Sequence, residues 1–158
     1  MKKLNHYFEE YSVSHQNKIN ILIHKFCVPL IMFSFLGIMK AFPVPADWPL
    51  WLDWSLIFIV FSFSYYSFFK NIRVIFALLL LIIPMIAILE FLRPKFFILS
   101  VILFVLAWIG QFIGHKIEGK KPSFFQDLFF LFIGPIWTMN KIMAQLGIDL
   151  KINNAKEI

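Results

Sequence analysis

Long apolar runs, separated by short polar turns, make up most of this chain. Four of the runs are long enough for a helix to cross a hydrocarbon core of about 30 Å at a rise of 1.5 Å per residue. The predicted transmembrane helices span residues 19–39, 50–69, 72–92 and 96–115. Prolines and tryptophans between the first two indicate a connecting loop at a bilayer interface.

The two ends of the chain have different patterns. Residues 3–13 place apolar side chains at helical spacing around two glutamates, which predicts a short amphipathic helix on the membrane surface. Residues 124–147 contain an apolar core of about twelve residues, shorter than a typical span, and Gly134-Pro135 interrupts it. We interpret this segment as a re-entrant or interfacial hairpin, with a fifth span as the alternative. Residues 1–158 are therefore predicted to form one integral membrane domain, an all-α polytopic helical bundle.

Composition supports a membrane protein. Hydrophobic residues make up 60% of the 158 residues and charged residues 15%, more apolar side chain than a soluble domain of this size can bury. The formal net charge of +6 indicates an anionic membrane surface or an acidic headgroup as partner. The pattern shows no sign of nucleic-acid binding. The single cysteine, Cys27, excludes an internal disulfide. We expect no cleavable signal peptide, because charged residues stand where its apolar core would be.

The distribution of lysine and arginine predicts the topology. With a cytoplasmic N-terminus, four spans leave twelve of these residues on the cytoplasmic side and three outside, whereas five spans leave nine and six. The positive-inside rule favours four spans. The expected location is the inner membrane of a bacterium or the endoplasmic reticulum of a eukaryote.

Candidate chemistry lies where the last long apolar run meets a basic loop. Gln111, His115 and Glu118 are spaced three and four residues apart, so they share one face of the predicted helix. Polar residues at the end of an apolar helix are costly unless they bind something. The lysines Lys116, Lys120 and Lys121 follow. The positive-inside rule explains most of this clustering of positive charge without a role in binding.

The four-span topology brings other histidines to the same membrane face. His24 begins the first span, His15 precedes it, and Asn20 shares a helix face with His24. Neutral imidazoles, with or without a carboxylate, suit iron, zinc or copper, and three ligands with open positions suit iron(II) oxygen chemistry. Asn20 and Gln111 would orient the imidazoles. We interpret His6 as an ordinary polar residue at the membrane interface rather than as a ligand.

Other sites are less compatible with the pattern. No HExxH zinc motif is present, and four histidines are too few for a membrane di-iron desaturase. Glu118 could instead form a weak surface pair with Lys121 or Lys25. The alternative from another class is a non-enzymatic haem-binding or lipid-binding membrane protein. Two axial imidazoles for haem are typically found within the membrane, which fits these interfacial positions less well.

Two segments resemble the 2-hydroxy fatty acid dioxygenase family. Residues 15–29, HQNKINILIHKFCVP, are similar to its HxxxxNxxxH...VP motif, and residues 108–123 to its WxxQFxGHxxE...P motif. The resemblance implies an iron(II)-dependent membrane enzyme that converts a 2-hydroxy fatty acid and O2 into CO2 and a fatty acid one carbon shorter. The matching site residues are His15, Asn20, His24, Gln111, His115 and Glu118.

One spacing departs from the family pattern. Fungal members have the glutamate four residues after the histidine, whereas Glu118 follows His115 by three. We therefore predict His15, His24 and His115 as metal ligands, with Glu118 beyond the ligand set. Lys116, Lys120 and Lys121 are predicted to hold the substrate carboxylate.

Overall fold

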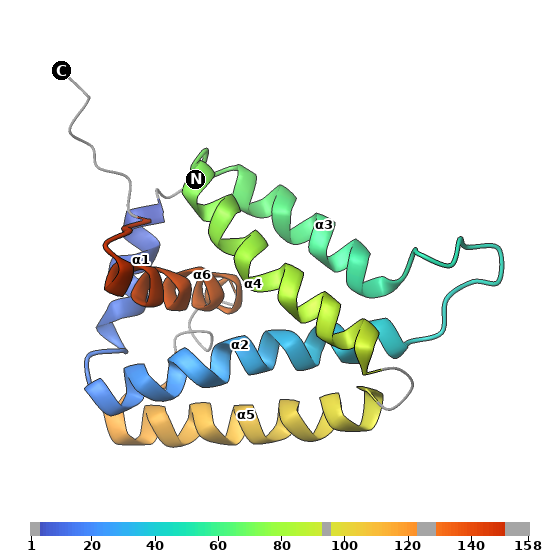
Figure 1. Cartoon of the computed structure of the whole chain (residues 1–158). Coiled ribbons are helices and arrows are strands. Elements are labelled where there is room, and N and C mark those ends of the chain that lie inside the picture. Colours follow the sequence, from blue (N-terminus) through green and yellow to red (C-terminus); the bar gives the residue numbers. More distant parts are fainter. Residues whose placement is uncertain (1–3, 93–95, 123–128, 151–158) are drawn as a thin grey trace.

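The computed structural model describes residues 4–92, 96–122 and 129–150, and its regular structure within these ranges is entirely helical. This confirms the predicted all-α class for the described residues. The predicted turn at 93–95, the start of the 124–147 segment and the end of the polar tail lie outside them. The elements are α1 (Leu4–Val13), α2 (Lys18–Ala41), α3 (Trp54–Ser67), α4 (Ile72–Phe91), α5 (Phe96–Glu118), α6 (Phe130–Met143) and the 3-10 turn η2 (Ala144–Leu146) (Figure 1).

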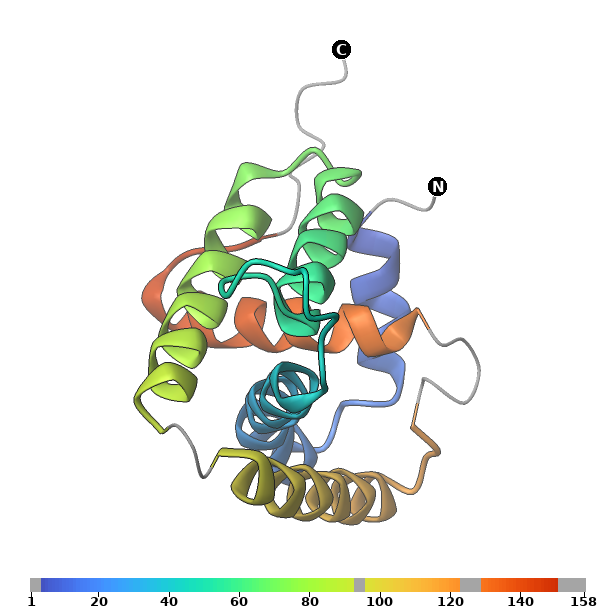
Figure 2. The same cartoon turned by 90° about the vertical axis from the view of Figure 1, so that its right-hand side faces the viewer.

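Three helices in the described ranges, α2, α4 and α5, are long and apolar enough to cross a membrane. Helix α3 is also apolar but has only 14 residues, about 21 Å of helix. It begins at Trp54 rather than at residue 50, because Asp53 caps it by accepting a hydrogen bond from the Leu56 amide (3.0 Å). The preceding residues form the loop seen at the end of α2 in Figure 2.

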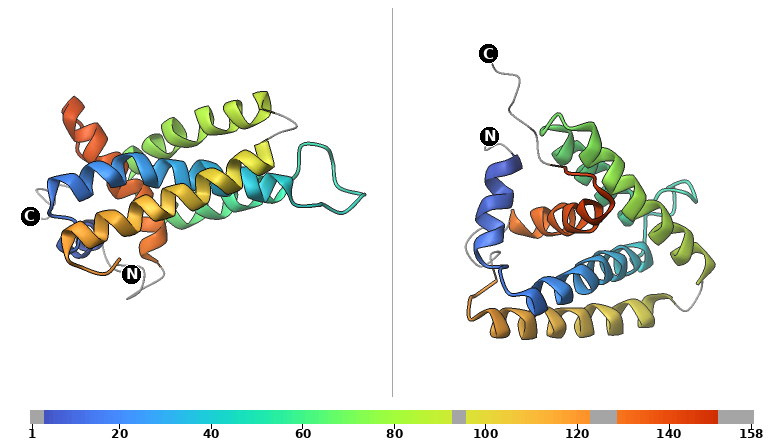
Figure 3. Two further views of the ribbon diagram at one scale, coloured as in Figure 1. Left: turned by 90° about the horizontal axis from the view of Figure 1, so that it is seen from below. Right: turned by 60° about the vertical axis from the view of Figure 1, so that its left-hand side comes forward.

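The helices form two layers with α6 between them. Helices α2 and α5 run antiparallel along each other, while α3 and α4 form a second pair (Figure 1). Helix α6 packs against α1, α2 and α4 and crosses α2 steeply, as the left view of Figure 3 shows. The start of α2 and the end of α5 thus lie together at one end of the molecule.

The predicted break at Gly134-Pro135 is wrong, because α6 runs through both residues as one helix. Proline at position 135 removes only the hydrogen bond to the carbonyl of Leu131, near the start of the helix. Gly134 serves close packing instead, since a Cβ there would lie 3.1 Å from the hydroxyl oxygen of Tyr11.

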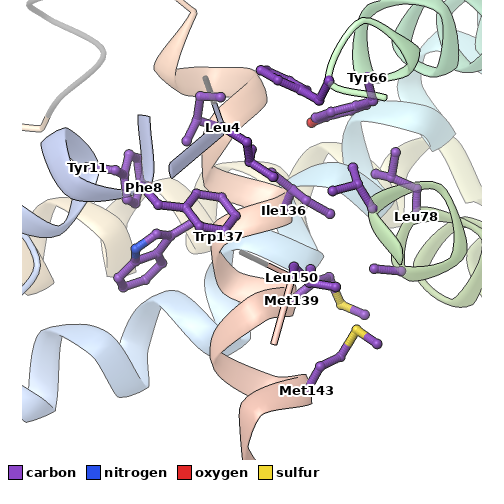
Figure 4. Packing of buried hydrophobic residues seen from close by; sticks show 14 of the residues in the cluster. Leu4, Phe8, Tyr11, Tyr66, Leu78, Ile136, Trp137, Met139, Met143 and Leu150 are labelled. Carbon is purple, nitrogen blue, oxygen red and sulfur yellow. The ribbon is translucent and has the colours of Figure 1, made fainter. Parts of the chain in front are cut away.

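The main core lies around α6. The apolar face of α1, with Leu4, Phe8 and Tyr11, is buried against α6, where Ile136 and Trp137 are also fully or almost fully buried (Figure 4). Helix α1 is therefore part of the protein core rather than a helix whose apolar face is left to lipid. This packing holds the end of α1 in place, immediately before His15.

Helices α2 and α5 approach closely because small residues line their contact. A Cβ at Gly114 would lie 2.4 Å from Oδ1 of Asn20, and one at Gly110 would lie 2.6 Å from Sγ of Cys27. At the other end, a Cβ at Gly37 would lie 2.1 Å from Oγ of Ser100. Glycines four residues apart allow two membrane helices to pack backbone against backbone. The close packing sets the distance between His24 on α2 and His115 on α5.

An ion-pair cluster joins three elements at the opposite end. Nζ of Lys40, at the end of α2, lies 2.7 Å from a carboxylate oxygen of Asp53 and 2.7 Å from one of Glu90. Asp53 precedes α3, and Glu90 is near the end of α4. The cluster therefore connects α2, α3 and α4 at the end of the molecule that lies away from the histidines.

Candidate metal centre

His15 and His24 are oriented by main-chain carbonyl groups one helical turn before them. Nδ1 of His15 donates to the carbonyl oxygen of Tyr11 (2.6 Å), and Nδ1 of His24 donates to that of Asn20 (3.0 Å). The Tyr11 ring also stacks on the His15 ring at 4.1 Å between centroids. A carbonyl oxygen only accepts, so in the neutral form each Nδ1 carries the proton and each Nε2 has a free lone pair.

The two Nε2 atoms face each other at 3.0 Å. With both Nδ1 atoms protonated, this contact places two lone pairs against each other, which is unfavourable unless a cation is shared between them. Two nitrogens about 2.1 Å from one metal ion and at right angles to each other are about 3.0 Å apart. The geometry of His15 and His24 therefore fits shared metal ligation.

His115 completes the group from α5. Its ring centroid lies 4.8 Å from that of His15 and 4.9 Å from that of His24. Its Nδ1 is buried and has no hydrogen-bond partner, which is unusual for a buried polar atom. One ring nitrogen from each of the three buried histidines lies within 4.8 Å of the other two. This donor set can hold a metal ion.

The protonation state of His15 favours ligation. Burial, together with the neighbouring His24, lowers the pKa of His15 to about 3. Because only an imidazole nitrogen without a proton binds a metal, the His15 side chain is ready to act as a ligand at neutral pH.

Glu118 connects the end of α5 to the loop that carries His15. One carboxylate oxygen accepts from the amide of Gln16 (2.9 Å), and the other accepts from the amide of Asn17 (2.8 Å) and from the side-chain amide of Asn20 (3.0 Å). These donors surround the start of α2, where a negative charge is favourable. Glu118 does not belong to the group of gathered histidine nitrogens, and its partners are N–H groups rather than the lysines considered above.

Asn20 and Gln111 lie beside the histidines in different ways. The side chain of Asn20 donates to Glu118 and, at 3.3 Å, to the Ser14 carbonyl, while its main chain orients His24. Gln111 is buried one helical turn before His115 and interacts with His24. The structure therefore brings both amides to the predicted site, each with a partner in the loop or in the histidine group.

The lysines and His6 lie elsewhere. Lys116, Lys120 and Lys121 are exposed, and Nζ of Lys120 donates to the Val13 carbonyl (2.7 Å). Their proposed contact with a substrate carboxylate remains a prediction. His6 is exposed and pairs with Glu10 on the same helix at 3.2 Å, away from the three buried histidines.

An apolar cavity of about 350 Å³ reaches the histidine group at His115, which is one of its lining residues. His115, Gln111 and Tyr11 line it at this end, and side chains of α2, α3, α5 and α6 line the rest. Its size is within the range of small-molecule sites. Sequence patterns did not reveal the cavity, because residues from five helices line it.

Two further features were missed in the sequence. Tyr11 and Trp137 flank His15, with the Trp137 ring centroid 5.1 Å from that of His15, although they lie far apart along the chain. No local motif marks either one. The glycine pair at 110 and 114, in contrast, is a recognisable small-residue motif for close helix packing and could have predicted the contact between α2 and α5.

Comparison with known proteins supports an enzyme. A family model described as 2-hydroxy-palmitic acid dioxygenase Mpo1-like matches residues 1–146. The chain is 27% identical over 139 residues to the 2-hydroxy-palmitic acid dioxygenase MPO1 of Saccharomyces cerevisiae, a match that covers 87% of this chain and 78% of the yeast protein. No solved structure matches the chain.

Proposed function

The chain belongs to the 2-hydroxy-palmitic acid dioxygenase Mpo1-like family, and on this premise we propose that it is an iron(II)-dependent dioxygenase of 2-hydroxy fatty acids. The reaction converts the 2-hydroxy acid and O2 into CO2, water and a fatty acid one carbon shorter. The observation that carries the proposal is the convergence of three buried imidazoles, one of which, His115, lines an apolar cavity.

Three neutral ligands favour this substrate class. His15, His24 and His115 would hold the ion without offsetting its charge, so an anionic chelating substrate is favoured over a neutral one. Bound iron(II) supplies open coordination positions and the electrons that activate O2. A 2-hydroxy acid offers both a carboxylate and a hydroxyl oxygen for chelation, and its acyl chain suits the apolar cavity.

The surrounding residues have distinct tasks in this proposal. The carbonyls of Tyr11 and Asn20 hold the proton of each imidazole on Nδ1, which leaves Nε2 as the ligand atom. Glu118 holds the His15 loop against α5. The Gln111 amide, in the cavity wall beside His115, is placed to donate a hydrogen bond to a bound carboxylate.

Metal analysis and product analysis of the purified protein test the proposal. We expect one iron per chain, no haem absorption band, and conversion of 2-hydroxypalmitate into a C15 acid with uptake of O2. Chelation should abolish turnover, and added Fe2+ rather than Zn2+ should restore it. A haem spectrum, or an iron-loaded protein that leaves 2-hydroxy acids unchanged, would contradict the proposal.

We further propose that α2, α3, α4 and α5 cross the membrane in turn, with both termini and the histidines on the cytoplasmic side. The twelve-to-three charge distribution supports this orientation. Contacts near the C-terminus also support it, because Asn71 and Arg73, at the turn after α3, donate to the carbonyls of Leu150 and Asp149. Reporter fusions at residue 158 should behave as cytoplasmic, and an extracytoplasmic reporter would refute the four-span arrangement.

A further inference from the structure

The apolar cavity runs along α2 and α5, away from the histidines. Its lining residues on α2 are Val28, Ile31, Met32 and Phe35, and those on α5 are His115, Gln111, Trp108 and Phe104. The helices are antiparallel, with Gly114 beside Asn20 and Gly37 beside Ser100. Both series therefore proceed in the same direction, from the histidine group toward the middle of the bundle.

The polar groups available to a ligand lie at the histidine end. Two lining residues on α3 also have hydroxyl groups: that of Ser62 donates to the Phe58 carbonyl (2.8 Å) and that of Tyr66 to the Phe132 carbonyl. Both protons are thus used within the protein. A ligand with a polar head at His115 and an apolar tail along the cavity matches this distribution.

The other end of the cavity is aromatic. The rings of Phe35 on α2 and Phe58 on α3 meet edge to face at 5.0 Å between centroids, and Phe58 also packs against Phe132 at 6.0 Å. Phe104 lies at the corresponding level on α5. Contact between aromatic rings holds Phe58 in place, so Phe35 and Phe58 form a fixed pair of rings in the cavity wall at this end.

From these contacts we propose that Phe35 and Phe58 set the length of the acyl chain that the site accepts, by closing the cavity at the methyl end of the substrate. The proposal rests on the proposed function for the identity of the head group. His24 and Phe35, and likewise His115 and Phe104, are eleven residues apart, about 16 Å at the helical rise. An extended methylene chain advances roughly 1.25 Å per bond, so about 13 bonds fit between the two ends.

The test compares 2-hydroxy fatty acids of 10 to 22 carbons, as typical lipid chain lengths, on iron-loaded protein. Phe58→Ala should move the optimum of kcat/KM to chains about two to four carbons longer. The preference for the longer chain over the wild-type optimum should rise about 10-fold or more. Ser62→Leu, which fills the cavity between its ends, should move the optimum to shorter chains. Phe61→Ala is the matched control, because Phe61 is on the same helix, 60% exposed and not part of the cavity wall.

A binding assay separates this proposal from the proposed function. Displacement of a fluorescent fatty acid by non-hydroxylated fatty acids of graded length needs neither iron nor turnover. The same length shifts in binding, without any activity on 2-hydroxy acids, would uphold the length boundary and refute the dioxygenase. Activity with an unchanged optimum in both Phe58→Ala and Ser62→Leu would overturn the boundary and leave the dioxygenase standing. A wild-type protein without length preference would also overturn it.

Discussion

Replacing His24 or His115 by alanine is expected to empty the metal site and reduce turnover to background. Each substitution removes one of three ligand nitrogens that lie within 4.8 Å of one another, and two remaining imidazoles bind a divalent ion much more weakly. His15→Ala should behave in the same way. Iron content per chain, measured on protein purified without added metal, and consumption of 2-hydroxypalmitate are the two measurements.

The chain provides a matched control in its fourth histidine. His6 is exposed and pairs with Glu10, so His6→Ala should retain iron and activity within about twofold, in line with an ordinary surface substitution. Equal loss in all four variants would place His6 in the site. Retained iron in any variant of the buried three would remove that histidine from the ligand set.

Glu118→Gln is expected to weaken metal binding and activity about 10- to 100-fold without abolishing either, as for other residues that orient metal ligands. The carboxylate accepts three hydrogen bonds, from the amides of Gln16 and Asn17 and from the side chain of Asn20. A glutamine side chain turns one amino group toward these donors, so the loop that carries His15 should be less firmly held. Iron titration of the purified variant gives the affinity directly.

The lysines provide the contrasting result. Lys116→Ala and Lys121→Ala should leave iron content unchanged and raise KM with little effect on kcat, the pattern of lost substrate binding. If Glu118→Gln contains no iron even at excess Fe2+, the carboxylate is a direct ligand. If the lysine variants keep the wild-type KM, the substrate carboxylate is held within the cavity alone.

The gathering of His15, His24 and His115 at one end of the molecule could be predicted from sequence because topology constrains it. Apolar runs of known length place His24 at the start of one helix and His115 at the end of an antiparallel one, at the same membrane depth. The role of Glu118 could not be predicted in this way, because its partners are amides of a loop about a hundred residues earlier in the chain. From sequence alone, a glutamate next to lysines is compatible with a surface ion pair. Only the folded position of the loop with Gln16 and Asn17 shows which donors Glu118 has.

In segment 124–147, by contrast, a local sequence rule led to a wrong prediction. Gly134-Pro135 is a typical helix-breaking pair, and the predicted hairpin followed from that local rule. In the structure, packing of α6 between α1, α2 and α4 keeps a single helix, because burial of several apolar side chains outweighs one lost hydrogen bond.

Hydrophobic periodicity by itself determined the helical class, the approximate helix positions and the shared end of the histidines, because these depend on local spacing and on the thickness of a bilayer. Only the tertiary structure showed that Nε2 of His15 and Nε2 of His24 face each other. It also placed Tyr11 and Trp137 around His15, turned Glu118 toward the loop and brought Phe35 and Phe58 together in the cavity wall. Each of these features requires side chains from separate helices to meet within a few ångströms, and that distance depends on how closely the helices pack. For α2 and α5, the close packing is possible because positions 110 and 114 are glycines.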